Sequence, residues 1–94
     1  MTQRLKWERG DPELRNDYRA FDPETGQIVG SIHENSGGGS AVWLWYGLGE
    51  IGNHSLTARG HEDTKQGAAD ALTAAWFEFK ARFGGNRYRQ AKGS

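Results

Sequence analysis

Residues 41–48 are the most apolar stretch of the chain, and they restrict its fold more than any other segment. Read as a β-strand, they place apolar side chains on both sides: Val42, Leu44, Tyr46 and Leu48 on one, and Ala41, Trp43, Trp45 and Gly47 on the other. Such a strand is typical of a sheet interior with both faces covered. We therefore expect a sheet around residues 41–48, with a helix on one face and loops, termini or a partner on the other.

Other segments favour strands because apolar and polar residues alternate along them: 4–8, 16–22, 27–33 and, more briefly, 55–59. The sequence Asp22-Pro23-Glu24-Thr25-Gly26 separates two of them and is typical of a turn. Proline presets φ at the second position of such a turn, and glycine tolerates the positive φ at its exit. Residues 16–33 are therefore predicted to form a β-hairpin.

The last regular element is predicted to be a helix that ends near Phe83, where Gly84-Gly85 provides a stop signal. Asp63 or Thr64 is suited to cap its start, and Gln66 occupies the capping-box position if Asp63 is the cap. At 100° per residue, one apolar stripe emerges along it, made of Ala68, Leu72, Ala75, Trp76, Phe79 and Phe83. The predicted fold class is α+β: an antiparallel sheet of four to five strands with one C-terminal helix packed across one face.

Composition fits a small folded domain with an aromatic core. Only 15 of 94 residues are Leu, Ile, Val or Phe, a share that is usual in disordered chains, but those chains also carry a high net charge. Here 12 basic residues balance 12 acidic ones, and 11 aromatic side chains supply large areas for burial. We expect one domain over residues 1–84, followed by a basic C-terminal tail over residues 85–94.

Charge is balanced in total but not along the chain. Residues 80–94 carry a net charge of +5, residues 10–79 carry −7, and the first nine residues carry +2. The tail either remains solvated against the acidic body or contacts phosphates or an acidic partner. Its candidate contact residues mix arginine and lysine with one aromatic, as in nucleic-acid-binding segments: Arg82, Arg87, Tyr88, Arg89 and Lys92. A nucleic-acid-associated accessory protein is therefore an alternative function.

Several functional classes have no support in the sequence. The chain has no cysteine, so it has no disulfide framework, thiolate ligand or thiol nucleophile. His33, His54 and His61 lack the tight spacing of a zinc site, and no signature places a catalytic triad. Residues 47–52 match the pattern G-x-G-x-x-G, but the residues after them favour another strand instead of the helix that dinucleotide binding needs. We expect no catalytic residues, metal, cofactor or small-molecule substrate.

We also expect no targeting signal in these residues. The first nine residues contain no apolar core of a signal peptide, and no apolar run is long enough to span a membrane. We expect a cytoplasmic protein that does not contact membranes.

The aromatic residues exceed what one helix on one sheet can bury. Phe77 is predicted on the polar side of the helix, and one side of residues 41–48 is left without cover. Uncovered aromatics in a small domain favour a protein interface, in which Trp and Tyr act as anchors. The candidate anchors are Trp43, Trp45, Tyr46 and Phe77, and the predicted partner is another protein or a second copy of the chain.

A set of short motifs resembles a group of small uncharacterised proteins encoded in bacterial genomes and in phages or other mobile elements. The motifs are Trp43-x-Trp45 in a strand, Ala58-Arg59-Gly60 at the end of another, and Thr64-x-x-x-Ala68 opening a helix that carries Trp76. The resemblance covers roughly residues 5–80, although an acidic residue often precedes the helix alanine in that group, where this chain has Gly67. It implies no assigned activity. By analogy with small phage proteins, it implies a non-enzymatic inhibitor or modulator of a host protein, such as a defence-system component.

Overall fold

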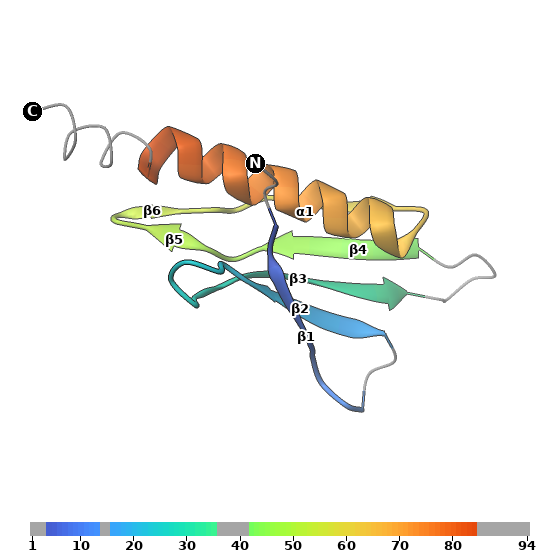
Figure 1. The fold of residues 1–94 in the computed structure, drawn as a ribbon. Helices are drawn as coiled ribbons and strands as arrows, with labels where there is room; N and C mark the ends of the chain where they lie inside the picture. Colours follow the sequence, from blue (N-terminus) through green and yellow to red (C-terminus); the bar gives the residue numbers. More distant parts are fainter. Residues whose placement is uncertain (1–3, 14–15, 36–41, 85–94) are drawn as a thin grey trace, which may run out of the picture.

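The computed structural model describes residues 4–13, 16–35 and 42–84, which form an antiparallel sheet with a helix lying across it (Figure 1). The sheet has five strands in the order β1-β2-β3-β4-β7. Their bounds are Lys6–Arg9 for β1, Asp17–Phe21 for β2, Ile28–Asn35 for β3, Val42–Gly47 for β4 and Arg59–Glu62 for β7. The predicted α+β class is confirmed. The predicted tail, residues 85–94, lies outside the described residues.

The predicted hairpin is present as β2 and β3, which pair from Asp17 opposite His33 to Phe21 opposite Ile28. Its turn contains Gly26 with φ of 77°, a backbone conformation that glycine adopts without strain. The register shifts by one residue at Ala20 and Phe21, so Val29 is an extra residue in β3. Val29 is fully buried, which shows that the shift serves the core.

The last sheet strand begins later than the sequence predicts. Residues 55–59 were expected as a strand, but the structure places β7 at Arg59–Glu62 and a separate small hairpin of β5 (Glu50–Ile51) and β6 (His54–Ser55) before it. Residues 50–55 pair with each other in that hairpin, so pairing with β4 begins only at Arg59. In the observed register Gly60 lies opposite Trp45, and a side chain at position 60 would come within 2.8 Å of the Trp45 indole nitrogen. Glycine at that position leaves room for the indole.

The helix α1 spans Lys65–Phe79 and continues as one π-helical segment, Lys80–Gly84. Thr64 is the N-cap, and its hydroxyl oxygen accepts a hydrogen bond of 3.0 Å from the backbone N–H of Gly67. Most of the predicted stripe is buried, namely Ala68, Leu72, Trp76 and Phe79, while Ala75 and Phe83 are half-buried. In the described part of the chain, no helix has the length and apolarity that a membrane span requires.

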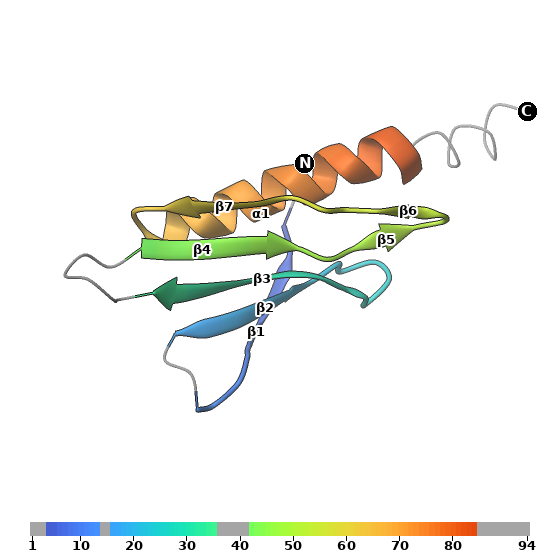
Figure 2. The same cartoon turned by 180° about the vertical axis from the view of Figure 1, so that it is seen from behind.

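The helix covers only part of one side of the sheet. It packs on β3, β4 and β7 and leaves β1 and β2 beside it. In Figure 2, seen from behind, β7 and β4 lie in front of α1. We call the side that carries Trp43, Trp45, Ile32 and Tyr18 the helix side of the sheet, because α1 packs against it.

Glycines mark the places where the helix approaches the sheet most closely. A Cβ atom at Gly30 would lie 2.7 Å from the Leu72 side chain. A Cβ atom at Gly49 would overlap the Trp76 ring. Because real Cβ contacts are longer than this, these two residues must stay glycine for α1 to sit at its observed depth.

Candidate functional site

The side of the sheet opposite α1 carries a set of apolar side chains that the helix cannot cover. Leu44 and Tyr46 alternate with the tryptophans of β4 and therefore point away from the helix. Phe21 and Ile28 are paired across β2 and β3, and Leu48 follows β4 in the same alternation. We call this surface the open face, and define its apolar part by Phe21, Ile28, Leu44, Tyr46 and Leu48.

The two exposed large apolar side chains of the described residues both belong to the open face. Leu48 is 52% exposed and Ile28 is 38% exposed. Polar side chains surround the apolar part in register with it: Ser31 and Arg59 lie on either side of Tyr46, and His33 and His61 on either side of Leu44. An apolar centre with a polar rim is the usual organisation of a protein interface.

Tyr46 is held in place on this face by its neighbour. Its ring stacks on the His33 ring, with centroids 5.7 Å apart and planes 14° apart. A hollow of about 430 Å³ lies next to it, lined by Tyr46, Leu48 and Arg59 among others. The open face therefore combines a positioned aromatic ring with a hollow that can receive an apolar side chain.

The four predicted anchors do not lie on one surface. Trp43 is only 9% exposed on the helix side, where its ring stacks on Tyr18 with centroids 6.5 Å apart. Trp45 is half-buried on the same side, and its indole N–H is buried without a hydrogen-bond partner in the structure. Phe77 is half-buried against the core, with the Lys80 ammonium 5.7 Å from its ring centroid. Only Tyr46 lies on the open face.

The candidate contact residues of the tail are for the most part not placed. Arg82 is exposed in the π-helical segment after α1. Arg87, Tyr88, Arg89 and Lys92 lie outside the described residues. A nucleic-acid contact through the tail therefore stays a prediction.

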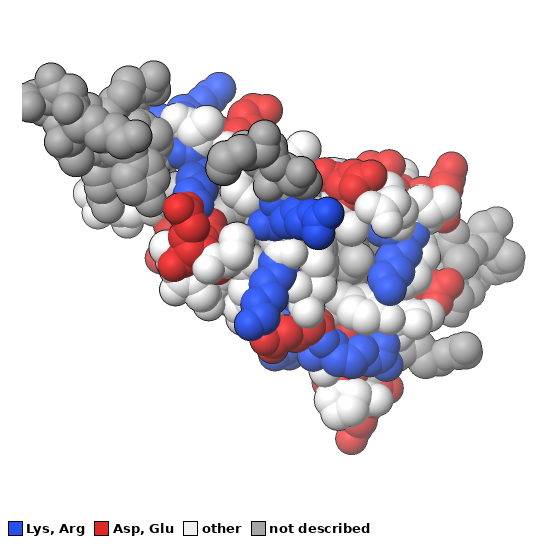
Figure 3. Space-filling model, viewed as in Figure 1, with Lys and Arg blue, Asp and Glu red and all other residues white. Residues whose placement is uncertain are grey.

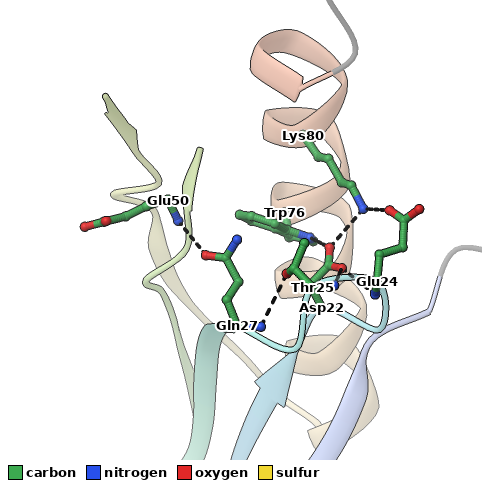
Figure 4. Close-up of polar contacts among 7 residues, drawn as sticks. All are labelled: Asp22, Glu24, Thr25, Gln27, Glu50, Trp76 and Lys80. Carbon is green, nitrogen blue, oxygen red and sulfur yellow. Dashed lines mark hydrogen bonds and ion pairs between the residues drawn. The ribbon is translucent and has the colours of Figure 1, made fainter. Parts of the chain in front are cut away.

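One polar cluster was not predicted from the sequence, and Figure 4 shows it. The carboxylate of Asp22 is fully buried where the β2–β3 turn meets α1. Its Oδ1 accepts hydrogen bonds from the backbone N–H groups of Glu24 and Thr25, at 2.7 and 3.0 Å. Its Oδ2 accepts a hydrogen bond of 2.8 Å from the Trp76 indole N–H and one of 3.0 Å from the Lys80 ammonium. Four donors therefore satisfy this buried carboxylate.

Charge compensation keeps Asp22 ionised. Burial by itself raises the pKa of the Asp22 carboxyl, but hydrogen bonds from Lys80, Trp76 and the turn outweigh it, so the pKa lies below its ordinary value. Burial lowers the pKa of Lys80, but its contacts with Glu24 and Asp22 outweigh that effect and raise it. The cluster fastens the hairpin to the helix. Because every acceptor position of the carboxylate is used within the chain, we assign it a structural role.

The remaining chemical candidates are dispersed. His54 stacks on Phe83 with centroids 4.0 Å apart, whereas His33 and His61 lie on two strands that flank β4. Across the described ranges, no three His, Asp or Glu side chains come close enough together to hold a metal ion. The glycine pattern at residues 47–52 runs from the end of β4 into the β5–β6 hairpin, so no helix N-terminus is aimed at it.

Comparison with known proteins adds no relative. No family model, curated protein sequence or solved structure matches this chain. The resemblance to small bacterial and phage proteins therefore stays a prediction, and the functional inference depends on the two sides of the sheet.

Proposed function

We propose that this chain is a non-enzymatic protein-interaction domain whose contact surface is the open face, and that the occupant of this face is a second copy of the chain. The observation that carries the proposal is the position of Ile28 and Leu48. They are the two exposed large apolar side chains of the described residues, and both lie on the face opposite the helix.

The chemistry of the open face supports an interface. Four alternate residues along and just after β4 are apolar on this side: Val42, Leu44, Tyr46 and Leu48. Water contacts part of each of these side chains, and covering them removes apolar area from water at about 25 cal/mol per Å². Tyrosine is a frequent anchor in interfaces, and Tyr46 is already oriented by the His33 ring. A partner therefore meets a surface that needs little rearrangement.

Two features support a second copy as the occupant. The chain has a net charge of zero, so two copies do not repel each other through their overall charge. In a two-fold arrangement the same surface meets itself, and the open face offers both the protruding Leu48 side chain and a hollow beside it. Two sheets packed face to face, about 10 Å apart, bury both open faces at once.

Size-exclusion chromatography with light scattering, over a range of protein concentrations, tests the proposal. We expect the wild-type mass to approach twice 10.5 kDa as concentration rises. The variant Leu48→Glu introduces a charge that the dimer would have to bury, so it should remain a monomer. The matched control is Ala74→Glu, which adds the same charge at an exposed position of α1.

A monomer at every concentration would contradict the second copy as occupant, and a dimer retained by Leu48→Glu would contradict the open face as the contact surface. Deletion of residues 85–94 separates this function from the alternative, because nucleic-acid binding through the tail would be lost and an open-face dimer would remain. That the chain modulates a host protein remains a prediction of the resemblance.

A further inference from the structure

A groove lies on the helix side of the sheet, next to the part of α1 that does not reach β1 and β2. The helix covers β3, β4 and β7, so the helix-side surface of β1 and β2 forms a shelf beside it. The groove between shelf and helix has a volume of about 370 Å³ and is lined by Trp7, Glu8, Arg9, Tyr18, Ile32, Lys65, Gln66 and Ala69. This volume falls within the roughly 300–1,000 Å³ that is usual for ligand sites.

Two cations converge on one aromatic ring at the end of this groove. The Lys65 ammonium lies 4.0 Å from the centroid of the Tyr18 ring, and the Arg9 guanidinium carbon lies 5.3 Å from it. They come from different elements, since Arg9 is opposite Tyr18 in the sheet and Lys65 is the first residue of α1. Within the described residues, neither cation forms a salt bridge with a carboxylate.

The two cations also affect the Tyr18 hydroxyl. Lys65, and Arg9 to a smaller extent, hold the pKa of the Tyr18 hydroxyl below its ordinary value, and burial opposes them. The first turn of α1 contains no acidic residue, so its N-terminal partial positive charge adds to theirs. Glu8 also lines the groove, but the two cations leave its lining with a net positive charge, which favours a negative group.

The floor of the groove is apolar. Ile32 is 1% exposed, Trp7 and Tyr18 are half-buried, and the small side chain of Ala69 forms part of the helix wall. A ligand that fits the whole groove therefore combines an anionic group with an adjacent apolar one. In Figure 3 basic side chains (blue) lie around the place where β1 passes α1, with acidic side chains (red) around them.

We propose that this groove binds an acidic peptide segment of a partner protein, with a carboxylate held between Arg9 and Lys65 and an apolar side chain against Trp7 and Ala69. A peptide fits better than a nucleic acid, because the groove offers only two cations, enough for one carboxylate. A polyphosphate backbone needs a longer track of positive charge than this. The groove and the open face lie on opposite sides of the sheet, so this inference does not depend on the dimer.

The test is a titration followed by ¹H–¹⁵N nuclear magnetic resonance on the full chain. The probe is a short peptide with blocked ends in which glutamate and leucine alternate, and the reference probe has glutamine in place of glutamate. We expect saturable shifts of the Trp7 indole and the Gln66 amide with the acidic peptide only, because both groups line the groove.

The double variant Arg9→Gln/Lys65→Gln should weaken binding about tenfold or more, since it removes both charge-assisted hydrogen bonds to the peptide carboxylate. The matched control is Lys6→Gln/Arg19→Gln. It removes the same two charges from exposed positions on the other side of β1 and β2, and should leave the affinity unchanged.

Three results would overturn the proposal: equal binding of the glutamine peptide, shifts confined to the open face, or the same loss of affinity in both double variants. Binding of a single-stranded oligonucleotide in preference to the peptide would replace it with a nucleic-acid site. If inorganic phosphate saturated the same shifts at the same concentration, the groove would be a site for small anions, and the peptide proposal would be wrong. A loss of affinity for the acidic peptide in Arg9→Gln/Lys65→Gln, but not in the control variant, would support the proposal.

Discussion

The two faces of this sheet are made by the same strands, yet only one of them carries a helix. Along β4 the residues Trp43 and Trp45 face α1, while Leu44 and Tyr46 face away from it. Apolar content along β4 therefore does not by itself decide which face is covered. The difference lies in the residues between the aromatics, because four glycines have their missing side chains directed at groups on the helix side: Gly30, Gly47, Gly49 and Gly60.

This comparison shows what a helix requires of the sheet beneath it. Leu72 and Trp76 of α1 occupy the space that side chains at positions 30 and 49 would fill. Ser31 follows Gly30 and Leu48 precedes Gly49. Both have side chains, and these point to the open face. The covered face is the one with room for a second layer.

The largest expected effect comes from removing Asp22, whose hydrogen bonds join the β2–β3 turn to α1; we call these contacts the joint. Asp22→Ala leaves the Trp76 indole N–H and the Lys80 ammonium without their buried acceptor. Loss of one partner from a buried charged pair costs about 3–5 kcal/mol of unfolding free energy. Urea denaturation measures it. The control Glu24→Ala, at a side chain 64% exposed, should cost less than about 1 kcal/mol, and equal losses would contradict the joint.

A side chain added on each side of β3 tests the steric difference between the faces directly. Gly30→Val should destabilise the chain by about 1–3 kcal/mol or more, because its Cβ would overlap Leu72 and the backbone carbonyl of Tyr46. The adjacent change Ser31→Val, on the open face, should stay within about 0.5 kcal/mol. The same denaturation curves give both values, and a similar cost at both positions would show that the open face is also closely packed.

Lowering the pH should reduce the free energy of unfolding that Asp22 contributes. Because the folded pKa of Asp22 lies below its ordinary value of 3.8, its contribution is present above that pH and is lost as pH falls through the folded pKa. Wild type should be more stable than Asp22→Asn near neutral pH, and the gap should close in acid. Thermal unfolding between neutral and strongly acidic pH measures it, and a gap that stays constant in acid would count against an ionised Asp22.

The smallest effect is expected on the open face of the isolated monomer. At low micromolar concentration Leu48→Glu should change the unfolding free energy by no more than about 0.5 kcal/mol, since Leu48 is already 52% exposed. Urea denaturation at that concentration measures it. A loss above about 1 kcal/mol would mean that the chain itself covers this face, and the two faces would then differ less than the described residues indicate.

Local signals in the sequence predicted most of the fold. Alternation located β2, β3 and β4 within one or two residues, and Gly26 marked the turn between the first two. Thr64 was one of two predicted caps, and the structure selects it because its hydroxyl accepts from Gly67. These features depend on residues near each other in the chain, which a sequence pattern records directly.

The parts that escaped prediction depend on pairs far apart in the chain. Nothing near Asp22 indicates a partner 54 or 58 residues later, so the joint with Trp76 and Lys80 was not foreseen. The side of β4 that receives the helix was also left open. The glycines at positions 30 and 60 carry that information, but only after the register opposite Gly47 and Trp45 is known.

The joint at Asp22 also sets an order of events during synthesis. Asp22 is made 54 residues before Trp76 and 58 residues before Lys80. At 5–20 residues per second, synthesis of these intervening residues takes roughly 3 to 12 seconds. During that interval no helix covers either face of the growing sheet, and only the backbone N–H groups of its own turn are present to donate to the Asp22 carboxylate. A chain that stops before Trp76 therefore leaves both faces of its sheet uncovered, and we expect such a product to be recognised by proteases and chaperones.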